Sequence, residues 1–168
     1  MTSDLKKQNN IAKTLRLRAV KNEDLPIFFD HQKEPEANQM AGFSAKDPRD
    51  RKAFEDHWRR IREDGSIIVK TIESRGKVLG YVASFLRLGR REVSYWIGKE
   101  YWGMGVCTMA LGQFLTEFSK RPLHARVAVT NPASLNVLKK CGFRVIKHEM
   151  SYAFAHNAEI KEAILILE

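Results

Sequence analysis

Two glycines between an apolar segment and an amphipathic one give the chain its clearest candidate for chemistry. The segment Trp102–Thr108 reads Trp-Gly-Met-Gly-Val-Cys-Thr, and a helical pattern begins within it, near Val106. Glycine allows main-chain conformations that other residues avoid and lets a ligand approach closely. The first amides of a helix lack internal acceptors and lie at the positive end of its dipole. The segment therefore predicts an anion site for phosphate or pyrophosphate, to which the Thr108 hydroxyl adds a donor.

The surroundings of this loop argue against two familiar phosphate-binding motifs. The Gly-Lys-Ser/Thr of a P-loop is absent from the loop. The dinucleotide fingerprint needs a third small residue at a fixed spacing and a parallel β-α-β unit. Here the loop lies mid-chain, after segments whose short connections predict an antiparallel meander. An ordinary strand-to-helix turn that holds two glycines remains the alternative.

A second segment, Asn131–Phe143, follows the next apolar run and has a structural explanation of its own. Asn131 suits a helix N-cap, Pro132 suits the first helical position, and Gly142 suits the residue after the helix ends. Those roles account for the three residues without any function. They do not account for the position of this short helix. It directly follows a strand that is expected to lie beside the strand before the glycine loop.

Taken together, the two segments resemble the GCN5-related N-acetyltransferases, the GNAT superfamily. They look most like the subgroup of ribosomal-protein N-terminal (alanine/serine) acetyltransferases, in which a Tyr-Trp-Gly-x-Gly loop and an Asn-x-x-Ser…Lys-x-Gly-Phe helix occur together. Tyr101–Gly105 and Asn131–Phe143 match these motifs, and the resemblance extends over residues 14–167. It implies an enzyme that transfers an acetyl group from acetyl-CoA to a primary amine by direct attack in a ternary complex. The acceptor would be a protein N-terminus, such as that of a ribosomal protein, or a small-molecule amine.

The resemblance also implies how acetyl-CoA binds. Its pyrophosphate would lie on the loop amides, and its pantetheine between the strands at 92–98 and 123–130, which splay apart in this fold. Asn131 would hydrogen-bond the pantetheine arm, and Ser134 would lie near the thioester sulfur. Cys107 stands where the family loop usually has glycine or alanine. The predicted cofactor-binding residues are Ile97, Gly98, Trp102, Gly103, Met104, Gly105, Val106, Cys107, Thr108, Asn131 and Ser134.

Acyl transfer to an amine needs a base for the amine, donors for the oxyanion and a proton or hydrogen bond for the thiolate. Glu92 is the candidate base, acting directly or through a water, at a position where the subgroup often has glutamate. The alternative for Glu92 is a solvent-facing strand residue paired with Arg90 or Arg91. Ser134 is the candidate acid, and Tyr152 is a weaker one.

Two further parts of the site are predicted more coarsely. Main-chain N–H groups near Ile97–Gly98 would contact the thioester carbonyl. The acceptor would enter between the early helices, at about 24–62, and the final hairpin, at about 150–162. His31, His57 and Trp58 are candidates to line that side.

Composition and charge restrict the class of protein. The 168 residues, 43% of them hydrophobic, suit a single domain over 14–168, preceded by a flexible polar arm at 1–13. The termini and apolar runs predict neither a secretion signal nor a membrane span, so a cytoplasmic protein is expected. Two cysteines and five histidines lack metal-ligand spacing, so no metal is expected. The net charge of +9 is dispersed along the chain and suits an anionic cofactor.

The order of predicted elements is that of a mixed α/β (α+β) fold. Apolar periodicity predicts a mostly antiparallel sheet of about seven strands with about four helices. The predicted strands lie near 15–20, 66–72, 78–88, 92–97, 123–130, 144–154 and 159–167. The helical segments lie near 24–40, interrupted at Pro35, and near 47–64, 106–119 and 132–140.

Other classes of function remain open at this point. A non-catalytic acyl-CoA-binding module would share the loop and the cleft. A basic nucleic-acid-binding domain would use the positive charge, although acidic residues interrupt most of the basic ones. Association with the ribosome would fit both the charge and the resemblance, and either a monomer or a homodimer is compatible with the sequence.

Overall fold

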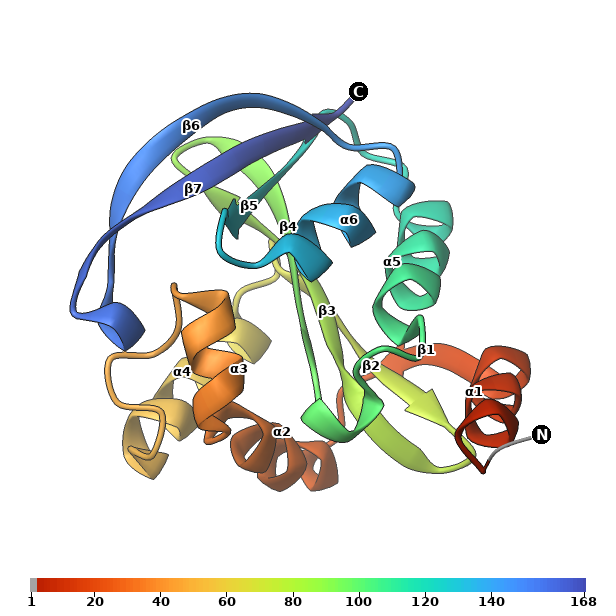
Figure 1. Ribbon diagram of the computed structural model, residues 1–168. Coiled ribbons are helices and arrows are strands. Elements are labelled where there is room, and N and C mark those ends of the chain that lie inside the picture. The colour runs from red at the N-terminus through yellow and green to blue at the C-terminus, as the bar shows by residue number, and fades with distance from the viewer. Residues whose placement is uncertain (1–2) are drawn as a thin grey trace.

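Seven strands form one open sheet in the order β1-β2-β3-β4-β5-β7-β6, with helices on both of its faces (Figure 1). The computed structural model describes residues 3–168. The strands are β1 (Leu15–Ala19), β2 (Ile68–Ser74), β3 (Lys77–Arg87), β4 (Arg90–Ile97), β5 (Leu123–Ala128), β6 (Arg144–Ala153) and β7 (Ala158–Leu167). The α-helices are α1 (Ser3–Thr14), α2 (Leu25–Gln32), α3 (Pro35–Ala41), α4 (Arg51–Glu63), α5 (Val106–Glu117) and α6 (Pro132–Lys140). Short 3-10 turns are η1 (Asn22–Asp24), η2 (Lys99–Tyr101) and η3 (Phe154–His156).

The pairing of β4 with β5 differs from every other pairing in the sheet. All other neighbouring strands are antiparallel, whereas β4 and β5 are parallel and share a single register pair, Glu92↔His124. Beyond that pair the two strands diverge toward their carboxyl ends. The mostly antiparallel sheet with splayed fourth and fifth strands is confirmed.

Two apolar clusters hold the helices to the two faces of the sheet. On one face, Val82, Val93 and Leu165 pack with Leu111 and Phe114 of α5 in the larger cluster. On the other face, α2 and α4 meet the sheet through the smaller cluster, made of Phe28, Phe29, Phe54, Trp58 and Val78. The rings of Phe28 and Trp58 stack with their centroids 4.9 Å apart. Phe54, Trp58 and Ile61 recur along α4 at spacings of four and three, and all three face the smaller cluster.

The N-terminal segment is a helix and not the predicted flexible arm. Ser3–Thr14 forms α1, in which Ile11 is buried in the larger cluster. At its end, Thr14 Oγ1 lies 2.6 Å from Ser74 Oγ of β2. The segment is so polar that its sequence shows no apolar stripe, and one buried side chain with a few polar contacts holds it in place. With α1 and the break at Pro35, the described residues form six α-helices and not about four.

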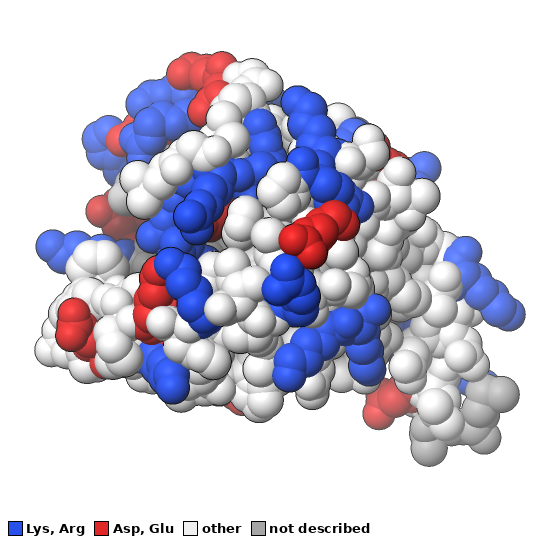
Figure 2. All heavy atoms as spheres, turned by 90° about the horizontal axis from the view of Figure 1, so that it is seen from above, with Lys and Arg blue, Asp and Glu red and all other residues white. Residues whose placement is uncertain are grey.

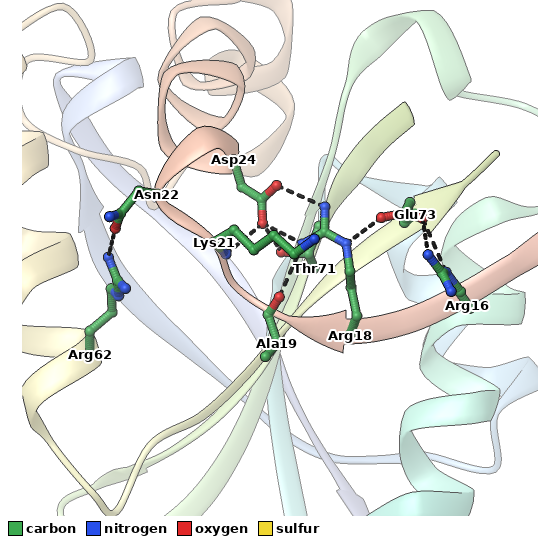
Figure 3. A network of polar contacts seen from close by, with 9 residues as sticks. All are labelled: Arg16, Arg18, Ala19, Lys21, Asn22, Asp24, Arg62, Thr71 and Glu73. Atoms are coloured by element: carbon green, nitrogen blue, oxygen red, sulfur yellow. Dashed lines mark hydrogen bonds and ion pairs between the residues drawn. The ribbon is translucent and has the colours of Figure 1, made fainter. Parts of the chain in front are cut away.

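A buried network of charges ties the start of the α2 region to the edge of the sheet (Figure 3). Arg18 of β1 donates to Asp24 Oδ2 at 2.7 Å and also to Glu73 of β2. Thr71 donates to the same Asp24 oxygen at 2.7 Å, and Arg16 binds Glu73 Oε1 at 2.6 Å. This network lies at the β1–β2 edge and contains none of the predicted site residues, so its role is structural.

Candidate active site

The glycine loop connects the end of β4 to the start of α5 in the conformation that glycine favours. Gly103 and Gly105 both have φ of +73°, in the left-handed region. A Cβ atom added to either would meet no atom within 4 Å, so the space beside both residues is open. Trp102 Nε1 donates to the Ile97 carbonyl oxygen at 3.0 Å and ties the loop to the end of β4.

The first turn of α5 presents unpaired amides to that open space. Gly105 is the N-cap and has no side chain to accept from them. The first helical bond runs from Met109 N to Gly105 O at 3.0 Å, so the amides of Val106, Cys107 and Thr108 have no helical acceptor. Because the helix dipole is positive at this end, the turn suits a pyrophosphate, and the residues present fit that group.

Cys107 does not supply a reactive thiolate in this turn. Burial, with a further contribution from nearby Cys141, raises the pKa of the Cys107 thiol well above its usual range. A helix N-terminus favours thiolate, but burial outweighs it here. The Cys141 thiol contacts Thr108 O at 3.8 Å, and burial raises its pKa as well. Both thiols therefore stay protonated at neutral pH.

The main chain of β4 supplies donors toward the diverging β5, although not from Gly98. Gly98 N donates to Leu79 O of β3 at 2.9 Å, so that amide is already engaged. In an antiparallel pair, alternate residues direct their N–H and C=O groups to opposite neighbours. Tyr95 and Ile97 therefore direct theirs toward β5, and of the pair Ile97–Gly98 it is Ile97 whose N–H lies on that side.

The second motif begins as its sequence predicts. Asn131 is the N-cap of α6, and its Oδ1 accepts from Ser134 N at 3.1 Å. The hydroxyl of Tyr95, from β4, lies 2.7 Å from Ser134 Oγ and 3.3 Å from the Ser134 carbonyl oxygen. Ser134 is thus tied both to the N-cap of its own helix and to β4.

Glu92 is buried and paired, with a partner other than the neighbouring arginines. Only 5% of the residue is exposed, and Oε1 accepts from Arg126 Nε of β5 at 3.0 Å. Arg126 Nη1 also contacts Glu149 at 3.1 Å and Glu162 at 2.8 Å. The alternative of a solvent-facing Glu92 paired with Arg90 or Arg91 is therefore wrong.

The electrostatics of this cluster are set by one cation among three carboxylates. Burial works to lower the pKa of Arg126, but hydrogen bonds to Glu92, Glu162 and Glu149 outweigh it and raise the pKa above its ordinary value. Ser151 donates to Glu162 Oε1 at 2.7 Å. The cluster links β4, β5, β6 and β7 at the point where β4 and β5 begin to separate.

Residues 14–144 match a family model described as an acetyltransferase (GNAT) domain. The chain belongs to the GNAT acetyltransferase family. It is thus an acetyl-CoA-dependent acyltransferase, and the resemblance read from its two motifs is confirmed. No curated protein is similar enough in sequence to give a significant match.

Solved structures share the fold of this acetyltransferase over most of its length. A spermidine N-acetyltransferase from Vibrio cholerae in complex with CoA and spermine has a TM-score of 0.79 at 18% identity, covering 92% of this chain and 95% of that one. RimL, a ribosomal L7/L12 α-N-protein acetyltransferase in complex with CoA, has a TM-score of 0.78 at 16% identity, covering 92% and 93%. A phosphinothricin acetyltransferase from Sinorhizobium meliloti in complex with AcCoA has a TM-score of 0.74 at 20% identity, covering 92% and 88%.

Tyr152, the weaker acid candidate, lies on the final hairpin of the acetyltransferase. It is 50% exposed, and its hydroxyl donates to Asn157 Oδ1 at 2.6 Å. Its ring meets that of Phe154 edge-on, with centroids 5.4 Å apart. No contact joins Tyr152 to Ser134 among residues 3–168, so the structure does not bring these two acid candidates together.

On the acceptor side, His31 contacts the end of β4. A Cβ atom added to Gly98 would lie 2.6 Å from His31 Nε2, so glycine is required for this close approach. Burial lowers the pKa of His31, although Glu100 and Asp30 oppose the shift. Trp58, by contrast, belongs to the smaller apolar cluster and does not line a cleft.

The final hairpin is joined to α3 at the side where the acceptor is expected. Gln39 Nε2 donates to Ala155 O at 2.6 Å, and the Gln39 carbonyl lies 2.7 Å from His156 Nε2. A pocket of about 270 Å³ lies beside these contacts, between α3 and the 44–49 segment. The early helices and the hairpin therefore do adjoin, as the predicted acceptor route requires.

Two residues of the site escaped the sequence analysis. Arg126 and Tyr95 are single strand residues, and neither belongs to one of the two motifs. The position of Arg126 on the strand expected beside that of Glu92 would have suggested Arg126, whereas no local pattern singled out Tyr95. Within the described chain, no helix has the length and apolarity to cross a bilayer, and no group of three or more His, Cys, Asp or Glu side chains is placed so that it could hold a metal ion.

Proposed function

We propose that this acetyltransferase acetylates the α-amine of a protein or peptide N-terminus by direct attack on acetyl-CoA in a ternary complex. The observation that carries the proposal is the open amide turn of α5 beside the diverging β4 and β5. A small-molecule amine is the second form of the same proposal. A cytoplasmic enzyme acting on a ribosomal protein is the version that the sequence resemblance favours.

The position of Glu92 favours an α-amine over a more basic amine. A peptide α-amine has a pKa of about 7.7–8.0 and a lysine amine about 10.4, so near neutral pH a sizeable share of the former is already deprotonated. Glu92 Oε1 is engaged by Arg126. We assign the base role to Glu92 acting through a water at its other oxygen. A base with only one free oxygen is best suited to an acceptor amine that is already largely able to lose its proton near neutral pH.

The remaining roles follow from the geometry around the cleft. The main chain of Ile97 would donate to the thioester carbonyl as the amine attacks. When the C–S bond breaks, its electron pair goes to sulfur, and Ser134 would donate a hydrogen bond to that thiolate. The amide turn from Trp102 to Thr108 and the Asn131 side chain would hold the rest of acetyl-CoA, which supplies the activated acetyl group.

An acceptor screen with acetyl-CoA, reading the released CoA thiol, tests the proposal. The panel holds peptides with varied N-termini, polyamines, aminoglycosides and amino acids, and peptides should give the highest turnover. Glu92→Gln and Ser134→Ala should lower turnover while leaving the Kd for CoA nearly unchanged. Glu162→Gln removes an equivalent partner of Arg126 from β7 and controls for the loss of the ion pair alone.

Three other results would contradict parts of this assignment. CoA binding without thiol release in any panel would indicate a non-catalytic acyl-CoA-binding module. Salt-sensitive nucleic-acid binding without protection by CoA would indicate the nucleic-acid class. Equal turnover in Glu92→Gln and Glu162→Gln would remove Glu92 from the role of base.

A further inference from the structure

Tyr95 contacts the side chain that the proposed reaction places beside the CoA sulfur. Tyr95 lies on the same face of β4 as Val93 and Ile97, and all three pack against the larger cluster with α5. Its hydroxyl is 2.7 Å from Ser134 Oγ and 3.3 Å from the Ser134 carbonyl oxygen. The contact joins β4 to the first turn of α6, which are the two elements that would flank the pantetheine.

The hydroxyl pair has two arrangements, and they differ in what Ser134 can do. In one, Tyr95 donates to the Ser134 carbonyl and accepts the hydrogen of Ser134 Oγ, so that hydrogen is unavailable. In the other, Tyr95 donates to Ser134 Oγ at the shorter of the two distances, and the Ser134 hydrogen is free for a third group. Only the second arrangement lets Ser134 donate to sulfur.

We propose that Tyr95 is a positioning residue, whose hydroxyl donates to Ser134 Oγ and so directs the Ser134 hydrogen at the departing thiolate. A serine hydroxyl otherwise rotates among three staggered positions. The Asn131 cap restrains the main chain of Ser134, and Tyr95 restrains its side chain. The inference rests on the proposed function, because it requires the CoA sulfur at Ser134.

Tyr95 acts through Ser134 and does not itself protonate the thiolate. Burial, together with Cys107, raises the pKa of Tyr95 above its ordinary range, and the hydrogen bond with Ser134 opposes this only in part. A thiol titrates near 8.5 and an unperturbed tyrosine near 10, so passing the Tyr95 proton to a thiolate is unfavourable. The thiolate is stabilised by a hydrogen bond, and the proton of the attacking amine leaves through Glu92 and its water.

The test measures the thiol pKa of bound CoA, which requires no knowledge of the acceptor. Thiolate absorbance is titrated for complexes of wild type, Tyr95→Phe, Ser134→Ala and the double variant, with desulfo-CoA complexes subtracted to cancel Cys107 and Cys141. Loss of one hydrogen bond should raise the bound thiol pKa by roughly half to one unit in Tyr95→Phe. The double variant should match Ser134→Ala, because Tyr95 acts only through Ser134. Tyr81→Phe, on the opposite face beside Trp58, is the matched control and should change nothing.

Turnover gives an independent readout once an acceptor is found. Tyr95→Phe should lower kcat by about three- to tenfold, with an unchanged KM for acetyl-CoA. An unaltered thiol pKa in Tyr95→Phe, or a further shift when it is added to Ser134→Ala, would overturn the inference. Calorimetry of CoA binding distinguishes a failure of the proposed function from a failure of the role given to Tyr95. Wild type that fails to bind CoA contradicts the proposed function and this inference together, whereas normal binding with an unaltered thiol pKa contradicts the role of Tyr95 alone.

Discussion

Arg126 is shared by carboxylates from three other strands, and this sharing governs the chemistry available to Glu92. The guanidinium presents several N–H groups in a fixed plane and can serve Glu92, Glu149 and Glu162 at once. A lysine ammonium has its three donors on one atom and cannot present the same planar, spread-out set to these carboxylates. The geometry at Glu92 therefore depends on arginine specifically and not on positive charge alone.

Arg126→Lys should destabilise the fold while keeping the net charge. Losing part of a buried, charge-assisted hydrogen-bond set is expected to cost about 1–3 kcal/mol of the free energy of unfolding. Urea unfolding at pH 7 measures it, with Arg144→Lys, in the exposed pair with Glu168, as the control that should cost about 0–1 kcal/mol. Equal losses in the two variants would mean that the buried cluster contributes no more than a surface ion pair.

Contacts between residues close in the sequence could be predicted, whereas contacts between distant residues could not. The Asn131 cap acts on Ser134, three residues away, and it was predicted correctly. Glu92 and Arg126 are 34 residues apart, and Tyr95 and Ser134 are 39 apart. These contacts exist because β5 and α6 return beside β4, which no local pattern encodes. The motifs therefore predicted Glu92 and Ser134 as candidates without identifying their partners.

Among the elements, the turn before α5 combines two requirements, a left-handed backbone and open space beside the amides, and one substitution tests both. Gly105 needs its left-handed backbone, whose adoption by alanine costs about 1–2 kcal/mol. An alanine methyl would also project into the open space beside the amides. Gly105→Ala should therefore lose both stability and affinity for CoA, measured by thermal unfolding and calorimetry.

Gly112 provides the matched control for the glycine loop. It lies within α5, and an added Cβ would meet nothing within 4 Å. Gly112→Ala should stabilise the protein by about 0.5–1 kcal/mol, because alanine loses less entropy in a helix, and should leave the Kd for CoA unchanged. Parallel losses of CoA affinity in Gly105→Ala and Gly112→Ala would argue against the α5 turn as the phosphate site.

Two carboxyls at the β1–β2 edge should make the free energy of unfolding depend on pH. Burial works to raise the pKa of Asp24, but hydrogen bonds from Arg18, the Lys21 amide and Thr71 outweigh it and hold the pKa below its usual value. Arg18 lowers the pKa of Glu73 in the same way. Since these carboxyls bind protons more readily in the unfolded chain, their stabilisation is present above about pH 5 and is lost as the pH falls.

Asp24→Asn should flatten that dependence. The variant should lose about 3 kcal/mol at pH 7, because it removes one partner of a buried ion pair. It should then lose less than wild type on going to pH 3, since one depressed carboxyl no longer titrates. Urea unfolding at pH 7, 5, 4 and 3 measures both effects, and parallel curves for the two proteins would contradict the assignment.

The elements themselves were predicted where their periodicity is strong. The strands and the helices at α4, α5 and α6 begin and end within a few residues of their predicted bounds. α1 was missed, because its helix is polar all round and its single anchor, Ile11, gains meaning only through contact with the larger cluster. A helix held by a single apolar contact with a distant part of the chain cannot be recognised from its own sequence.

For the molecule as a whole, the net charge of +9 sets the field that any acceptor must cross. Figure 2 shows Lys and Arg side chains spread over the face seen from above, with fewer Asp and Glu among them. Such a field concentrates anionic ligands, which include acetyl-CoA, and repels cationic ones. The carboxylates around Arg126 act against it locally, where β4 and β5 begin to separate.

The salt dependence of kcat/KM for charged acceptors shows whether the net positive charge or the carboxylates around Arg126 dominate the field that the acceptor meets. With acetyl-CoA saturating, kcat/KM for a peptide with an acidic N-terminal sequence should fall several-fold between about 0.02 and 0.5 M salt, because screening removes the long-range attraction. A polyamine or lysine-rich peptide should be a poorer acceptor at low salt and should improve as salt rises. A cationic acceptor that is best at low salt and weakens with added salt would mean that Glu92, Glu149 and Glu162 guide the acceptor more strongly than the net charge repels it. The proposed class of acceptor would then move from peptide α-amines to polycationic amines, while the amide turn of α5 would keep its assigned role.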